Sequence, residues 1–529
     1  MQSPKEPGDR NSTEVGYQHS MGQAMSMNHK RFLYQLALIA GLSSFIYWLV
    51  FTLPYPLSRL YATIPPVDYA KLTSHSAVGC VVYIVSVLVL FGLYGWAFHL
   101  TVPAASGGRT AAVGGRFILF SSAILAAVSI PAYPLTAIDM FSYAIHTRGW
   151  ALYGLNPLAT APAALPSYDP WLGLAGEWGD APSPYGPVWE WLSLAAYHLS
   201  GGTFLAHLLA LKVLTALAYL GCVGLLYQIL RRIRPEWAVA GTLAFAWNPL
   251  VLLESVQNGH NDIVMAFFLL AALGVMARST DKAVSKPPTL VQVALASLLL
   301  AVSILVKFMT VLVVPFFELA LAMSPVHWQR RLGMVGLSVF LIGATVALGM
   351  LPLWPGLENW AVLTGGQQTG RSLLTLMILG LRDWIGLNQA FDLSRTLLLL
   401  AFLLIYLHDF WTTCRQAQNS PTYVQVCSPA FYTLFWFVLI VAPIFHAWYL
   451  LWFVPLMPLL LPDRRPWRVS TVFSLTALLI IPYFETVRAW YPALLHNQLL
   501  GHLIGIPLLI GPPLLAMFWP IKHPVDVTV

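Results

Sequence analysis

The chain has 529 residues, of which 58% are hydrophobic and only 9% are charged. Soluble domains carry about 25% charged residues, so this composition excludes a soluble globular protein and predicts an all-α polytopic membrane protein. The formal net charge of +7 does not indicate nucleic-acid binding. The cations fall in short loops between apolar segments, which is the positive-inside pattern of membrane proteins.

Apolar segments of about 20 residues, the length that crosses a bilayer, fill most of the chain. They predict a transmembrane domain over 29–522, between a disordered cytoplasmic tail at 1–28 and a short cytoplasmic tail at 523–529. Lys30 and Arg31 place the N-terminus inside, and alternation places the C-terminus there too. About 14 spans are expected, near 32–53, 76–99, 115–134, 203–230, 238–254, 263–278, 288–306, 308–324, 332–353, 393–411, 428–445, 448–461, 469–484 and 498–519.

Lys307 interrupts one long apolar run at 288–324. We expect a tight hairpin there, with Lys307 at its outer tip. The alternative, a single tilted span, would invert the topology downstream and move the arginine pairs at 330–331 and 464–465 to the outer face, against the charge rule.

The two longest non-cytoplasmic loops, 135–202 and 354–392, collect much of the polar chemistry. If 139–150 is helical, Asp139, Tyr143 and His146 lie on one face of that helix. A carboxylate at the membrane boundary beside tyrosine and histidine suits a general base. The structural alternative is that Asp139 is the N-cap of the helix.

A turn-dense segment at 177–187 follows in the same loop. Its Pro and Gly residues fix the direction of the backbone. Trp178 and Tyr185 offer flat faces that suit stacking on a sugar ring, and Asp180 offers a polar contact. An aromatic belt at the membrane interface is the alternative interpretation of the aromatic residues.

The segment 258–262 joins two predicted spans and contains His260 and Asp262. Both can contact a sugar, and His260 can also carry a proton or contact a phosphate. Asn261 or Asp262 can instead serve as the N-cap of the next helix. No Asp-x-Asp sequence or triad of histidine and carboxylate at ligand spacing accompanies them. We therefore expect no obligatory metal and no cofactor.

Three cations, Lys307, Arg371 and Arg488, fall on the outer side, against the positive-inside rule. Binding of a lipid-linked phosphate would explain their retention, and Arg371 is the preferred candidate. Snorkelling to the headgroups is the alternative. His446, in a very short outer loop, can contact the same phosphate or cap the turn.

Several of these segments resemble, in the same order, the polyprenol-phosphomannose-dependent α-1,6-mannosyltransferases of bacteria, which are GT-C superfamily glycosyltransferases. The resemblance covers roughly 115–460. Its motifs are Asp-x-Phe-Ser-Tyr at 139–143, Gly-x-Asn-Pro at 154–157, Pro-Tyr-Gly-Pro at 184–187, Trp-Asn-Pro-Leu at 247–250, Gly-His-Asn-Asp at 259–262 and His-Ala-Trp-Tyr-Leu at 446–450.

The resemblance implies a GT-C fold, a polyprenyl-phosphate sugar donor, a glycan or glycolipid acceptor in the outer leaflet, and Asp139 as the base. Tyr143, His146 and Asn156 join the candidate sugar or acceptor contacts. We therefore expect a mannosyltransferase in a bacterial plasma membrane, surrounded by membrane lipids, with its active site on the non-cytoplasmic side and an inverting reaction.

Two alternatives stay open at this point. The same fold can use another polyprenyl-phosphate sugar, such as arabinose or glucose. A lipid or sugar flippase is the alternative from a different class, but a transporter would place charges deep within its spans or carry matched broken helices. Here the charges gather at one face, and no matched pair of broken helices is evident.

Overall fold

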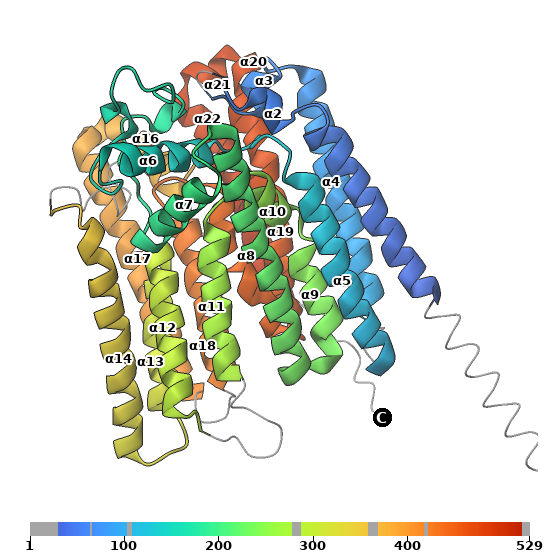
Figure 1. Ribbon diagram of the computed structural model, residues 1–529, viewed down its shortest axis with the longest axis vertical. Coiled ribbons are helices and arrows are strands. Elements are labelled where there is room, and N and C mark those ends of the chain that lie inside the picture. The colour runs from blue at the N-terminus through green and yellow to red at the C-terminus, as the bar shows by residue number, and fades with distance from the viewer. Residues whose placement is uncertain are drawn as a thin grey trace, which may run out of the picture.

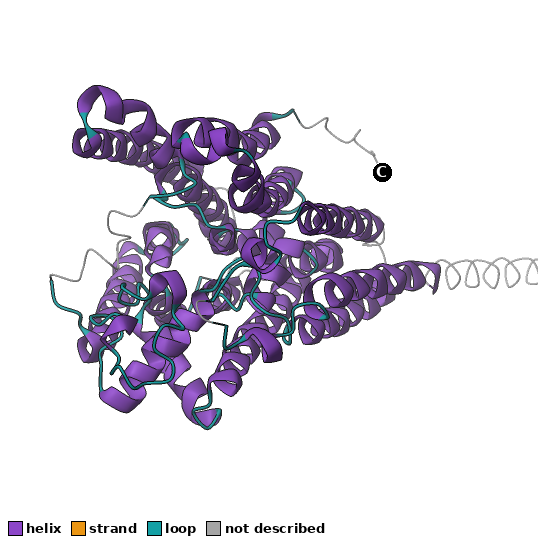
Figure 2. Cartoon of the chain, turned by 90° about the horizontal axis from the view of Figure 1, so that it is seen from above, coloured by secondary structure: helices purple, strands orange, loops and turns teal. Residues whose placement is uncertain are grey.

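The computed structural model describes residues 30–63, 66–102, 108–277, 287–357, 369–416 and 422–520. Throughout these residues the regular structure is helical, and extended pairing is limited to two isolated bridges, Pro56 with Ala132 and Gly370 with Ile444. Figure 2 shows this all-helical arrangement from above. The predicted tails at 1–28 and 523–529 lie outside the described residues.

Eight helices in the described part of the chain are long and apolar enough to cross a membrane. A ninth candidate is a bent pair, Pro235–Ala246 with Pro249–Gln257, and five shorter apolar helices accompany them. Each predicted span has a helical counterpart among these, while the count of about 14 spans stays a prediction. The helices that make up these apolar segments include Lys30–Thr52, α4 (Ala77–Thr101), α5 (Gly108–Ser129), α8 (Phe204–Ile233), α9 (Ala238–Ala246), α11 (Asp262–Ala277), α12 (Leu290–Val306), α13 (Val314–Ala322), α14 (Trp328–Met350), α17 (Leu387–Gln416), α18 (Thr422–Trp436), α19 (Arg464–Pro482) and α22 (Gln498–Phe518).

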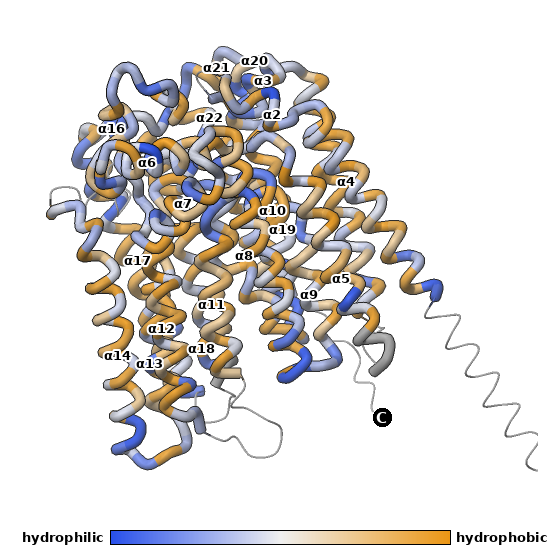
Figure 3. Tube along the Cα trace, in the orientation of Figure 1, coloured by the Kyte–Doolittle hydropathy of each residue, from blue (hydrophilic) through white to orange (hydrophobic). Residues whose placement is uncertain are grey.

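These apolar helices run side by side, and most of the remaining elements gather at one end of them (Figure 1). The opposite ends of α8 and α14 are hydrophilic (Figure 3) and carry the arginine pairs at 231–232 and 330–331. The short elements are α2 (Leu57–Leu60), α3 (Tyr69–Leu72), α6 (Asp139–Tyr153), α7 (Pro187–Leu199), α10 (Pro249–Leu252), α16 (Leu373–Ile385), α20 (Arg488–Trp490) and α21 (Pro492–His496).

The expected hairpin at Lys307 is present. Helix α12 ends at Val306, Lys307 has an extended backbone, and the chain turns back through η7 (Phe308–Val313) into α13. Helices α12 and α13 both pack against α14.

Helix α6 begins at Asp139 and ends at Tyr153, and the φ of +67° at its C-cap residue Gly154 suits glycine. Its N-cap is Ile138, and no side chain caps it. The N-cap interpretation of Asp139 is therefore wrong, and its carboxylate is directed elsewhere.

A 55° bend separates α9 from α10. Proline at 249 has no N–H to continue the preceding helix, and the side chain of Asn248 accepts a hydrogen bond from the backbone of Leu250. The bend leads into the π-helical turn η6 (Leu253–Gln257) and then into the fully buried segment 258–261. The chain thereby brings polar side chains into the interior beside Asp139.

Candidate active site

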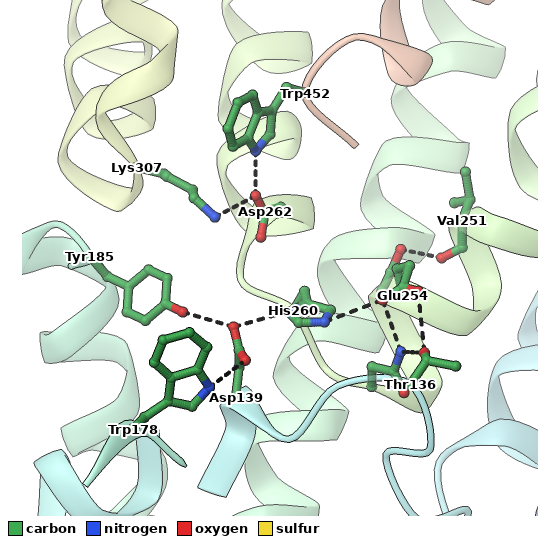
Figure 4. A network of polar contacts seen from close by, with 12 residues as sticks. Thr136, Asp139, Trp178, Tyr185, Val251, Glu254, His260, Asp262, Lys307 and Trp452 are labelled. Carbon is green, nitrogen blue, oxygen red and sulfur yellow. Dashed lines mark hydrogen bonds and ion pairs between the residues drawn. The ribbon is translucent and has the colours of Figure 1, made fainter. Parts of the chain in front are cut away.

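Asp139 lies at the centre of a polar network (Figure 4). Trp178 donates its Nε1–H to Oδ1 of Asp139, and Tyr185 donates its hydroxyl to Oδ2, each at 3.1 Å. Asp139 is buried, which raises the pKa of its carboxyl group, while His260 and Lys307 act in the opposite direction. Each carboxylate oxygen keeps one lone pair for a further proton donor.

The predicted face of α6 packs against the segment 176–186. The ring of Tyr143 meets that of Tyr185 edge-on, with centroids 4.9 Å apart. His146 contacts backbone carbonyls through both nitrogens, Nδ1 with Ser142 at 2.9 Å and Nε2 with Ala181 at 3.2 Å, and burial lowers its pKa to about 4. His146 thus holds the segment in place and has no contact with Asp139.

The Pro-Tyr-Gly-Pro segment is anchored on two sides. The backbone N–H of Gly186 donates to the carbonyl of Val306 at 3.0 Å, which joins this turn to the end of α12. Ser183 donates to Glu190 at 2.6 Å, and burial raises the pKa of Glu190 to about 7. These contacts fix the position from which Tyr185 reaches Asp139.

His260 lies between two carboxylates (Figure 4). Its Nδ1 is 3.9 Å from Oδ2 of Asp139, and its Nε2 is 3.2 Å from Oε2 of Glu254. Asn258 donates to Glu254 at 2.8 Å, and Thr136 donates to it at 3.3 Å. Sequence reasoning did not select Glu254, although a lone acid after an Asn-Pro break in an apolar segment was a usable signal.

Lys307 is paired in this structure. Its Nζ donates to Oδ1 of Asp262 at 2.6 Å, and Trp452 donates its indole N–H to the same oxygen. The ammonium also lies 5.4–5.5 Å from the ring centroids of Tyr185 and Tyr449. Asp262 therefore neutralises Lys307.

A cavity of about 340 Å³ opens beside Asp139. Its wall includes Trp178, Trp448 and His446, and the His446 ring stacks on Trp448 with centroids 4.1 Å apart. Burial lowers the pKa of His446 well below its ordinary value, so its ring is neutral. The charged residues of the wall are the four acids Asp68, Asp139, Glu177 and Glu485 and the two cations Lys71 and Arg371.

Arg371 has a φ of +50°, which is rare for a residue with a side chain. Backbone hydrogen bonds hold this segment against another: Gly370 donates to Pro443 at 3.2 Å, and Phe445 donates to Gly370 at 2.9 Å. The guanidinium forms an ion pair with Glu485. Arg371 and Asp139 consequently line one cavity although they come from distant parts of the sequence.

Four of the thirteen predicted site residues, Asp139, Trp178, Arg371 and His446, line this cavity, and the other nine do not. Three of those nine are held or placed elsewhere. Arg488 donates to the carbonyl of Leu494 and to Gln498, while the side chain of Asn156 accepts from the backbone of Leu158. Asp180 is exposed on the loop surface. Within the described residues, no three His, Cys, Asp or Glu side chains are grouped so that they could hold a metal ion.

The arrangement joins three chemical capabilities. A buried carboxylate can accept a proton, a guanidinium in the same cavity can bind an oxyanion, and aromatic faces can pack against a sugar ring. Asp139, Arg371 and Trp178 supply them respectively.

The chain resembles two curated mannosyltransferases. It is 24% identical over 373 residues to alpha-(1->6)-mannopyranosyltransferase B of Corynebacterium glutamicum, covering 66% of this chain and 60% of that protein. It is also 24% identical over 387 residues to a probable alpha-(1->6)-mannopyranosyltransferase of Mycolicibacterium smegmatis, covering 65% of each. The chain thus spans somewhat less than two thirds of these relatives.

Among solved structures, the chain resembles apo ArnT from Cupriavidus metallidurans, with 14% identity, a TM-score of 0.41, and coverage of 77% of this chain and 76% of that one. It also resembles the apo oligosaccharyltransferase of Archaeoglobus fulgidus, with 12% identity, a TM-score of 0.35, and coverage of 76% and 55%.

A family model described as alpha-(1->6)-mannopyranosyltransferase, N-terminal domain, matches residues 54–323, just over half of the chain. The match includes Asp139, Tyr185, Glu254 and His260. The chain therefore belongs to the alpha-(1->6)-mannopyranosyltransferase family.

Proposed function

We propose that this protein is a membrane mannosyltransferase that moves a mannosyl residue from a polyprenyl-phosphate donor to a glycan or glycolipid acceptor at the non-cytoplasmic face. The observation that carries the proposal is the shared cavity, in which the buried carboxylate of Asp139 and the guanidinium of Arg371 both line the wall. Membership of the family supports the choice of mannose.

In the proposed reaction, Asp139 accepts the proton of the attacking acceptor hydroxyl as that oxygen bonds to the anomeric carbon of the donor. The bond between the anomeric carbon and the phosphate oxygen breaks, and the polyprenyl phosphate leaves with the bonding electrons. Arg371 stabilises the charge that develops on the phosphate. A β-linked donor then gives an α-linked product, because attack and departure occur on opposite faces of the sugar.

The hydrogen bonds from Trp178 and Tyr185 orient the carboxylate for this role. They occupy one lone pair of each oxygen and leave Asp139 able to accept from a bound hydroxyl. Lys307 contributes through its position near the base, since its charge favours the ionised form of Asp139. Direct binding of the phosphate by Lys307 would require it to leave Asp262.

The test is a transfer assay with purified protein, labelled polyprenyl-phosphate mannose and a short α-mannoside acceptor, run with and without a chelator. We expect wild type to transfer mannose and Asp139→Asn to lose about 10²–10⁴-fold in rate. Asp383→Asn, which removes an exposed carboxylate in α16, is the matched control and keeps full activity.

The same assay separates the alternatives. Full activity of Asp139→Asn would show that Asp139 is not the base. Transfer only from polyprenyl-phosphate glucose or arabinose would change the sugar. Movement of the donor across vesicle membranes without any transfer to acceptor would identify a flippase instead.

A further inference from the structure

The ion pair between Arg371 and Glu485 lies in the wall of the cavity. The two residues come from different segments: Arg371 precedes α16, and Glu485 lies in the π-helical turn η12 (Tyr483–Val487) that follows α19. Both remain partly exposed, with side-chain accessibilities of 33% and 23%. The pair can therefore be reached by a ligand in the cavity.

The backbone fixes both partners in place. The left-handed conformation at Arg371 is held by the bonds between Gly370 and the segment 443–445. On the other side, the carbonyl of Glu485 contacts Nδ1 of His75 at 2.9 Å. Because hydrogen bonds hold both backbones in place, the two side chains start from fixed positions near each other.

The charge of the cavity opposes an anionic ligand. Its wall carries four carboxylates and two cations. One of those cations, Arg371, is already paired with the carboxylate of Glu485. A guanidinium binds carboxylate and phosphate through the same planar set of N–H donors. A phosphate that binds Arg371 must compete with Glu485 for those donors.

We propose that Glu485 is a built-in competitor of the donor phosphate and sets the affinity of the cavity for polyprenyl phosphates. This inference rests on the proposed function. In the free protein the Glu485 carboxylate holds the place of the phosphate, and the donor enters by displacing it. After transfer, Glu485 pairs with Arg371 again and thereby assists release of the polyprenyl phosphate.

The experiment measures binding of undecaprenyl phosphate to the purified full-length protein without acceptor. Glu485→Gln is expected to bind it about three- to tenfold more tightly, since the competing ion pair is lost. Arg371→Gln is expected to bind it more weakly. The double variant is expected to match Arg371→Gln, because Glu485 acts only through that guanidinium.

Two controls define the effect. Asp383→Asn removes an exposed carboxylate of α16 that is not part of the cavity wall, and it is expected to change affinity less than about twofold. Undecaprenol, which lacks the phosphate, is expected to bind wild type and Glu485→Gln equally. Glu485→Met provides a second charge-removing variant if Glu485→Gln folds poorly.

The outcomes separate the two proposals. Equal or weaker binding of undecaprenyl phosphate by both Glu485 variants, with wild type binding normally, would overturn the competitor role and identify Glu485 as a residue that orients Arg371. Absence of binding by folded wild type would instead contradict the proposed donor class. In turnover, the competitor role predicts a lower KM for the donor in Glu485→Gln.

Discussion

The backbone of Gly186 packs directly against that of Leu305, so closely that no methyl group fits between them. The adjacent hydrogen bond from Gly186 to Val306 fixes the same contact. Tyr185 directly precedes Gly186, and Lys307 directly follows Val306. One backbone contact thereby sets the distance between the tyrosine that holds the base and the cation that lies near it.

Gly186→Ala is accordingly expected to disrupt the site. An added Cβ would meet the main chain of Leu305, which cannot rotate away, so we expect destabilisation of about 1–3 kcal/mol and a loss of transfer activity. Thermal unfolding and the transfer assay measure the two effects. Gly179→Ala, in the same loop but with ordinary contact distances at its Cβ, is the control; equal behaviour of both variants would contradict the packing explanation.

The pH dependence of transfer reports on Asp139. The base works only when ionised, so activity falls as the pH drops through its pKa. Burial raises that pKa, and the hydrogen bond from Tyr185 lowers it. Tyr185→Phe removes the lowering contribution, so the acid limb of kcat/KM is expected to move to higher pH. Tyr153→Phe, which loses a bond to Asp169 instead, should leave the limb unmoved, and a downward shift in Tyr185→Phe would refute this assignment.

Lys307→Met is expected to destabilise the protein. It leaves the carboxylate of Asp262 buried without its cation, which costs about 3–5 kcal/mol. The double variant Lys307→Met/Asp262→Asn removes both charges and is expected to recover most of the loss in thermal stability. A double variant no more stable than the single one would mean that Lys307 stabilises the fold by other contacts.

The membrane orientation can be tested by labelling on intact cells, in a background without Cys80, Cys222, Cys414 and Cys427. Asp180→Cys is expected to react with a membrane-impermeant maleimide, and Arg232→Cys only after permeabilisation. These exposed residues lie in the loop after α6 and in the last turn of α8. The reverse pattern would place the cavity on the cytoplasmic side.

The helices and the turn at Lys307 were predictable because hydropathy and a single cation within an apolar run are local signals. The pairings were not. Asp262 and Lys307 were each selected from the sequence, yet their contact depends on how α11 and α12 pack. Glu485 pairs with Arg371 although the two lie more than 100 residues apart in the chain. No local sequence pattern in either segment predicts this ion pair.

Two of the bonds that hold the Arg371 segment against 443–445 join main-chain atoms, and a third runs from the Ser372 hydroxyl to the carbonyl of Pro443. An alanine scan of Pro443, Ile444 and Phe445 would remove side chains and leave most of these bonds intact. Such a scan would therefore report the segment as dispensable even though it orients the arginine. Replacing the amide of Phe445 by an ester, which deletes the N–H donor to Gly370 and keeps every side chain, would expose a dependence that side-chain substitution cannot detect.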